Sequence, residues 1–169
     1  MSQMKNLSRA ALFAGLSTVL VYFSSVTPTG KLAVLAVSGF VCAVVLIHCG
    51  YSWSLGVFAV SAALSLLIVP IKACGVLYAV FFGWYPVVKS LFEKIHSAFM
   101  PLICKIAVFN VVATILLFAF RELVFSEIPF PELGIVVLYV IGNVAFVLYD
   151  ICLTIVIGQY IRQISKHIK

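Results

Sequence analysis

The sequence predicts an all-α fold class, a polytopic membrane protein built as a compact six-transmembrane-helix bundle from a single integral membrane domain, residues 1–169. Two observations carry this prediction. Hydrophobic residues make up 64% of the chain and charged residues only 9%, which is too much apolar surface for a soluble globule of this length to bury. The apolar residues also form continuous runs, whereas the strands of a membrane barrel would alternate in polarity.

Six apolar runs approach the roughly 20 residues that a membrane-spanning helix needs. They are Leu7–Phe23, Lys31–His48, Ser52–Ile71, Cys74–Phe92, Met100–Phe120 and Leu133–Tyr160. The connectors are short and leave no room for a separate soluble domain. Because Lys5 and Arg9 precede the first run, a signal peptide is an alternative there. The length of the run and the poor cleavage site at Ser24-Ser25-Val26 favour a retained helix.

Small side chains mark the first helix. Ala10, Ala14 and Ser17 follow one another at helical spacing and form a stripe that a second helix can approach closely. Two uses of this stripe remain open, which are packing inside this bundle and docking of another membrane protein. The third helix is rich in Ser, Ala and Leu and is expected to end at Pro70, so that it forms a tight hairpin with the fourth.

The fourth helix carries an unusual polar face. Tyr78, Tyr85, Lys89 and Glu93 lie on one side of it at separations of seven, four and four residues. Pro86 lacks a backbone donor and is expected to kink the helix. Lys89 and Glu93 can form an ion pair at the cytoplasmic end, with Lys89 reaching the lipid headgroups. A catalytic role for these residues is the alternative.

Two further charges belong to the fifth and sixth runs. Lys105 lies in the fifth, and Asp150 lies on the polar face of the sixth. Counting helical rise from Pro131 puts Asp150 near the inner membrane boundary, at the depth expected for Lys89 and Lys105. A buried Asp beside Lys costs less than either charge alone. We therefore expect an intramembrane charge cluster of Lys89, Glu93, Lys105 and Asp150. This cluster would clamp the fourth, fifth and sixth helices together.

The distribution of basic residues predicts the orientation. With the N-terminus inside, eight Lys and Arg residues fall on the cytoplasmic side and three on the outer side, as the positive-inside rule requires. The chain is thus expected in the cell membrane as a multi-pass protein with both termini cytoplasmic. The basic residues behind its net charge of +6 are expected to contact membrane lipids with anionic headgroups. No binding of nucleic acid is expected.

Motifs for familiar chemistry are missing from the sequence. The five cysteines have no metal-binding spacing, so no metal site is expected. There is no G-x-x-x-x-G-K-[ST] loop, no H-E-x-x-H and no G-x-S-x-G. We predict no cofactor and no enzymatic activity. An intramembrane enzyme acting on lipid through Lys89, Glu93 or Asp150 remains an alternative.

Six spans, short connectors and the segment Arg9-Ala10-Ala11-Leu12-Phe13-Ala14-Gly15 together resemble one family. The chain looks like the S component of energy-coupling factor transporters, small membrane proteins that bind vitamins or metal ions. In that family an Ala-x-x-x-Ala pattern on the first helix faces a transmembrane coupling protein. The resemblance implies partner docking by Ala10 and Ala14, and toppling in the membrane to deliver cargo to a coupling protein and two ATPase subunits.

The resemblance also implies a small-molecule ligand held in an outward cavity. Its candidate contacts are Tyr78, Arg121, Glu122, Glu127 and Tyr139. The function to expect is a membrane-embedded substrate-binding subunit that captures a vitamin-like solute for uptake with separate energising partners. A structural or regulatory membrane protein of cell-envelope assembly is the main alternative.

Overall fold

The computed structural model describes residues 2–94, 99–119 and 135–167, and these residues are helical apart from short connections. The elements are α1 (Ser2–Val26), α2 (Lys31–Cys49), α3 (Tyr51–Ile68), α4 (Lys72–Leu77), the π-helix η1 (Tyr78–Phe82), α5 (Tyr85–Phe92), α6 (Met100–Ala119) and α8 (Ile135–His167). Six helical stretches of the described chain are long and apolar enough to cross a membrane, with α4, η1 and α5 counted as one. The prediction of an all-α membrane fold with six spans is confirmed.

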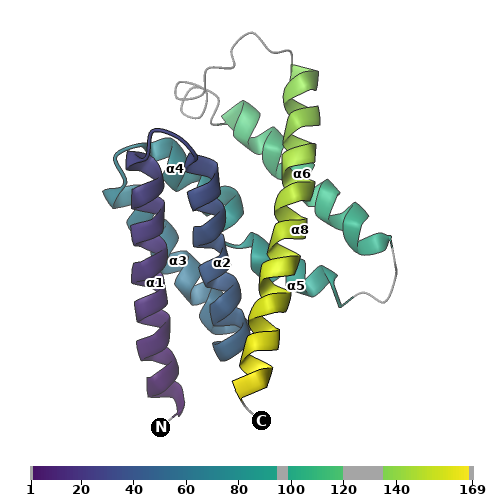
Figure 1. The fold of residues 1–169 in the computed structure, drawn as a ribbon. Helices are drawn as coiled ribbons and strands as arrows, with labels where there is room; N and C mark the ends of the chain where they lie inside the picture. The colour runs from purple at the N-terminus through teal and green to yellow at the C-terminus, as the bar shows by residue number, and fades with distance from the viewer. Residues whose placement is uncertain (1, 95–98, 120–134, 168–169) are drawn as a thin grey trace. The chain divides into compact units, whose positions relative to one another are not determined.

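The chain divides into two compact units, Met1–Pro131 and Glu132–Lys169. The first unit contains α1 to α6, and the second contains α8 (Figure 1). A lone spanning helix has no core of its own. Membership of all 169 residues in a single membrane domain therefore stays a prediction.

In the first unit, α1, α2 and α3 pack against one another and against the fourth span. Their buried faces carry small and hydroxyl-bearing side chains such as Ala14, Ser17 and Ser38. Large apolar side chains point outward instead, as Leu12 and Phe23 do at 73% and 63% exposure. This distribution is the one expected in lipid, because apolar side chains are favourable outside the bundle and small ones let the helices approach closely.

The hairpin between α3 and α4 is tight, as the sequence predicts. α3 ends at Ile68, and Val69 is extended because it precedes Pro70. The Lys72 ammonium then donates to the carbonyl oxygens of Leu66 (2.9 Å) and Leu67 (3.2 Å). These carbonyls lie in the last turn of α3, where a cation is favourable and no intrahelical donor is available.

The fourth span leaves the regular α-helical pattern before Pro86, at a point that we call the break, and a kink at Pro86 itself stays a prediction. Pro86 lies in the first turn of α5, where its missing N–H removes no hydrogen bond, and the break falls two residues earlier, at Gly83–Trp84. The Gly83 amide donates to the Tyr78 carbonyl (2.8 Å) with the five-residue spacing of a π-helix. The Trp84 indole N–H donates to the Val80 carbonyl (2.7 Å), which the Trp84 amide would reach in a continuous α-helix. The Gly83 amide and the Tyr78 and Val80 carbonyls are thus satisfied locally, as lipid demands.

Close packing against α3 holds the break in place. A Cβ atom at Gly83 would lie 2.4 Å from Phe58 Cδ2 and 3.1 Å from Tyr78 Cζ. Any side chain at this position would therefore displace the Phe58 ring or the Tyr78 ring. Glycine is required here for close approach, and its role is to bring η1 against α3.

Candidate functional site

Five polar residues from four elements meet inside the first unit. We call Ser17 (α1), Ser38 and Cys42 (α2), Ser61 (α3) and Tyr78 (η1) the hydroxyl cluster, and all five are fully buried. The Tyr78 hydroxyl lies 2.8 Å from Ser17 Oγ, 2.7 Å from Ser61 Oγ and 3.5 Å from Cys42 Sγ. The π-helical turn of η1 presents Tyr78 to three helices at once.

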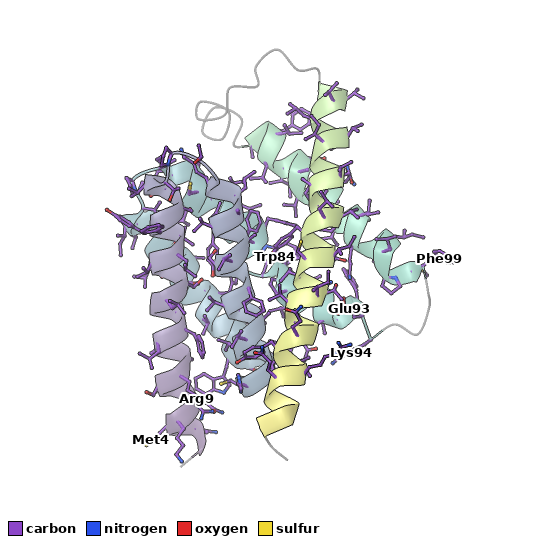
Figure 2. The ribbon with its side chains drawn as sticks, viewed as in Figure 1. Met4, Arg9, Trp84, Glu93, Lys94 and Phe99 are labelled. Carbon is purple, nitrogen blue, oxygen red and sulfur yellow. The ribbon has the colours of Figure 1, made fainter. Side chains whose placement is uncertain are left out.

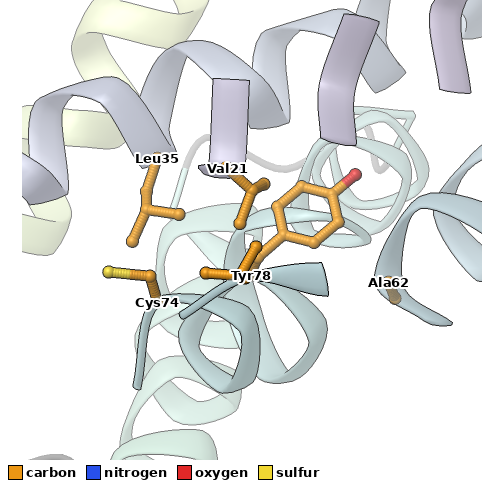
Figure 3. Close-up of a cluster of buried hydrophobic side chains, with 6 residues drawn as sticks. Val21, Leu35, Ala62, Cys74 and Tyr78 are labelled. Atoms are coloured by element: carbon orange, nitrogen blue, oxygen red, sulfur yellow. The ribbon is translucent and has the colours of Figure 1, made fainter. Parts of the chain in front are cut away.

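An apolar shell surrounds the Tyr78 ring. Val21, Leu35, Ala62 and Cys74 pack around it, and the hydroxyl oxygen is directed away from Cys74 (Figure 3). The ring carries the hydroxyl across this apolar layer to the serines. Burial of the ring is favourable in itself, while burial of the hydroxyl requires the partners it has.

The short distances favour one order of donors through the cluster. Ser61 Oγ donates its only proton to the Val57 carbonyl (2.7 Å), so the Tyr78 hydroxyl donates to Ser61, and Ser17 donates to Tyr78. In the reverse order Ser17 would donate to the Ser38 carbonyl at 3.3 Å, a weaker bond. Each hydroxyl can both donate and accept, so the order of donors through the cluster can reverse. The cluster can therefore present either a donor or an acceptor to a bound molecule.

Ser65 lies one turn of α3 beyond Ser61, and we call the hydroxyl cluster together with Ser65 the hydroxyl column. It lies four residues after Ser61 on the same helical face and is fully buried. Its Oγ has no hydrogen-bond partner within the described residues. A buried hydroxyl without a partner costs about 1–3 kcal/mol, and such atoms are uncommon in native proteins. Ser65 therefore offers a donor and an acceptor that no described residue uses.

A second polar group, the charge cluster, consists of Lys89, Glu93 and Lys105. Glu93 Oε1 lies 2.8 Å from Lys89 Nζ and 3.1 Å from Lys105 Nζ. The Lys89 side chain is 1% exposed and the Glu93 side chain 44% exposed, and Glu93 lies just past the end of α5 (Figure 2). The predicted Lys89–Glu93 ion pair is confirmed. Lys89 is buried, however, and does not extend to headgroups, because its ammonium turns to this carboxylate.

The electrostatics of Glu93 reflect two opposing effects. Burial of the carboxyl raises its pKa, while the hydrogen bonds and positive charges of Lys89 and Lys105 lower it. The lysines together outweigh burial, so the pKa of Glu93 falls below its usual value. The carboxylate is therefore the stable form at neutral pH and holds the two ammonium groups together.

The residues predicted to contact substrate are spread over the chain. Tyr78 lies in the core, with its hydroxyl enclosed by the hydroxyl cluster. Arg121, Glu122 and Glu127 lie outside the described residues. Tyr139 belongs to α8 in the second unit, where its carbonyl accepts a hydrogen bond from Asn143 Nδ2 (2.8 Å).

Asp150 also belongs to α8, in the second unit. Within that helix its carbonyl accepts a hydrogen bond from Thr154 Oγ1 (2.9 Å). The pairing of Asp150 with Lys89 or Lys105 stays a prediction. The part of the expected charge cluster that the first unit contains, Lys89 with Glu93 and Lys105, is present.

Ala10 and Ala14 are internal packing residues of the first unit. They are 8% and 5% exposed, and the buried residues around them are Cys42, Val45 and Val57. This is the alternative that the sequence left open, and it leaves no exposed small-residue face at these two positions. The neighbouring Ala11 and Gly15 are exposed instead, with nothing within 4 Å of a Cβ atom at Gly15.

The hydroxyl cluster was not anticipated from the sequence. A signal was present, because Ser54, Ser61 and Ser65 are spaced by seven and four residues and so share one face of α3. All three are fully buried. Their spacing alone does not name their partners, since those come from α1, α2 and η1.

The chain is a multi-pass membrane protein by its six apolar helices. Its first unit contains one buried neutral polar cluster and one charged cluster with buried lysines and a half-exposed carboxylate. No metal-binding group of His, Cys, Asp and Glu side chains occurs among the described residues. Comparison with protein-family models, with curated proteins and with solved structures finds no match for this chain.

Proposed function

We propose that this protein is a membrane-embedded subunit that binds a small polar solute for uptake and is energised by separate partner proteins. One observation carries the proposal, namely the buried hydroxyl column at the π-helical turn of the fourth span, in which the Ser65 hydroxyl has no hydrogen-bond partner among the described residues. Single π-helical turns inside α-helices are frequent at functional sites. Polar atoms inside a membrane are costly and are most often retained for function.

The chemistry of the column suggests the kind of solute. Ser17, Ser61, Ser65 and Tyr78 carry hydroxyl groups and no formal charge. They suit a neutral, vitamin-like molecule with carbonyl, amide or hydroxyl groups. Such a solute would use the free Ser65 hydroxyl and would reverse the donor order at Tyr78 where it needs an acceptor.

Energy for uptake would come from other proteins in this proposal. The sequence contains no P-loop for ATP. A transmembrane coupling protein and ATPase subunits are the partners we propose, in a cell membrane and with both termini in the cytoplasm. The orientation follows from the eight-to-three asymmetry of basic residues.

A thermal-shift experiment on the full chain in detergent tests the solute site. A panel of vitamin-like solutes is added, and a solute at about 100 times its Kd is expected to stabilise the fold by about 2.7 kcal/mol. Ser65→Ala and Tyr78→Phe should lose that shift. Tyr85→Phe is the matched control, since Tyr85 is a fully buried tyrosine of the same span outside the hydroxyl cluster. Equal shifts in all three variants would exclude the column as the site.

Purification from the native membrane tests the partners. Coupling and ATPase subunits that co-purify with the full chain would support uptake. If no solute in the panel shifts the melting temperature and no such subunits co-purify, the proposal fails.

The second candidate is a structural or regulatory membrane protein of cell-envelope assembly. The observation that favours it is that the Tyr78 hydroxyl already has hydrogen-bond partners within the protein, Ser17 and Ser61. In this reading the hydroxyl cluster only ties α1, α3 and η1 together. Tyr78→Phe would then lower stability without affecting the binding of any solute.

A further inference from the structure

Positive charge gathers at one end of the first unit. The start of α1 lies beside the end of α2, where Cys49 Sγ is 3.9 Å from Asn6 Oδ1. The starts of α3 and α6 both meet the end of α5. Basic residues at this end are Lys5, Arg9, Lys89, Lys94 and Lys105. Within the described part of the first unit the only acidic residue is Glu93, which two of these lysines share.

The opposite end of the same unit has fewer described basic residues, and one of them is bound by backbone carbonyl oxygens. Its described cations are Lys31 and Lys72. Lys72 is held by the carbonyl oxygens of Leu66 and Leu67 and serves as a cap for α3. An external anion would therefore meet a much weaker positive field there.

An aromatic and basic corner lies at the charged end. We define the headgroup corner as Tyr51 at the start of α3 and Ser90 and Lys94 at the end of α5. The Lys94 ammonium lies 4.7 Å from the centre of the Tyr51 ring. Ser90 Oγ lies 2.7 Å from the Val87 carbonyl oxygen and 3.1 Å from the Tyr51 hydroxyl oxygen. The Tyr51 hydroxyl can turn its proton to Ser90 or to an acceptor outside the protein.

Apolar surface adjoins this corner. Leu55 follows Tyr51 by one turn of α3 and is 46% exposed, while Leu91 lies one turn before Lys94 and is 47% exposed. Tyrosine also favours the membrane–water boundary, where its ring is apolar and its hydroxyl is wet. Hydrogen-bond donors for a phosphate, from Lys94 and Tyr51, thus lie beside apolar surface that suits acyl chains, from Leu55 and Leu91.

We propose that the headgroup corner binds the phosphate of an anionic phospholipid. The Lys94 ammonium and the Tyr51 hydroxyl donate to phosphate oxygens, and the acyl chains lie against Leu55 and Leu91. The predicted orientation puts this end at the cytoplasmic leaflet, whose surface is negatively charged. The proposal is independent of the solute site.

Lipid titration of the purified full chain in detergent tests this site. Phosphatidylglycerol is titrated against the wild type, and bound lipid is counted by native mass spectrometry. Lys94→Gln is expected to weaken binding about five-fold, the change that one lysine near a charged headgroup contributes. Tyr51→Phe should weaken it as well, because the variant loses the phenolic donor and keeps the ring. Lys31→Gln is the matched control, since it removes one charge at the opposite end.

Two other arms identify the source of the phosphate. Phosphatidylcholine should bind more weakly than phosphatidylglycerol, because its choline group cancels the phosphate charge. Glycerol phosphate, which has no acyl chains, should not compete at equal concentration. Equal loss in Lys94→Gln and Lys31→Gln would overturn the site, and full competition by glycerol phosphate would overturn the assignment to lipid.

Discussion

In the hydroxyl cluster every polar atom is neutral and lies between packed helices, whereas the charge cluster gathers three ions where α5 ends and α6 begins. Tyr78 has hydroxyl partners from α1 and α3, and the chain of donors ends on the Val57 carbonyl. Lys89 and Lys105 instead both form an ion pair with the Glu93 carboxylate. The neutral cluster is fully buried, and the charged one keeps its shared anion half-exposed.

This difference shows how an apolar chain tolerates polar groups. A hydroxyl can be satisfied by the backbone of its own helix, as Ser61 is by Val57, so the loss of one partner leaves others. A buried ammonium that loses a carboxylate partner finds no neutral substitute of equal strength. The charge cluster should therefore be sensitive to single substitutions, and the hydroxyl cluster tolerant of them.

The largest effect is expected for Glu93→Gln. The variant keeps the shape of the side chain but removes the anion that Lys89 and Lys105 share. We expect a loss of about 2–3 kcal/mol in the free energy of unfolding, less than a fully buried pair would give because Glu93 is half-exposed. Chemical denaturation in detergent measures it. Lys94→Gln, next in the chain, is the control and should change stability by less than about 1 kcal/mol.

Acid titration sharpens the same test. The pKa of Glu93 is lowered in the folded protein, against the effect of burial, by the two lysines. The stabilisation is therefore present at neutral pH and is lost as the pH falls below the ordinary value of 4.5 and through the lowered folded value. Glu93→Gln should flatten this part of the stability profile. If Glu93→Gln loses stability at acid pH as the wild type does, that loss does not come from Glu93.

Gly83→Ala is the next test, since Gly83 lets η1 carry Tyr78 to the hydroxyl cluster. Its added methyl group would meet the Phe58 ring at 2.4 Å and the Tyr78 ring at 3.1 Å. Overpacking of this kind costs about 1–3 kcal/mol. Gly15→Ala is the control, because a Cβ atom there meets nothing within 4 Å. Equal melting temperatures of the two variants would show that the break in the fourth span is not held by this contact.

A smaller effect is expected for Tyr78→Phe. The hydroxyl disappears, but Ser61 keeps its bond to the Val57 carbonyl, and Ser17 can turn to the Ser38 carbonyl. We expect a loss of about 1 kcal/mol, near the net value of one hydrogen bond. A loss as large as that of Glu93→Gln would erase the proposed contrast between the two clusters. The double variant with Ser61→Ala should be non-additive, because both changes remove the same bond.

The smallest effect is expected for Ser65→Ala. Its hydroxyl has no hydrogen-bond partner in the described part of the protein, so removal should leave stability unchanged or raise it slightly. Ser54→Ala is the matched control, because Ser54 Oγ donates to the Cys42 carbonyl (2.8 Å), and its loss should cost about 1 kcal/mol. A Ser65→Ala variant as unstable as Ser54→Ala would mean that Ser65 has a structural partner.

The class of fold and the number of spans could be predicted from the sequence alone. Continuous apolar runs of sufficient length leave helices as the only way to satisfy the backbone in lipid. The Lys89–Glu93 pair was also predictable, since residues four apart on a helix are neighbours. Lys105 was predicted to join this cluster from its depth in the fifth span, but its direct ion pair with Glu93 was not, because the two residues come from different helices and no periodicity relates them.

Only the tertiary structure decided which face of each helix is internal. In a soluble helix, polarity separates the core face from the solvent face, but here lipid and core are both apolar and that contrast is missing. The sequence therefore left two uses open for Ala10 and Ala14, and packing put both in the core while Ala11 and Gly15 remained exposed. For the same reason Ser17 and Tyr78 could not be paired beforehand, since their meeting depends on how α1 and η1 pack together.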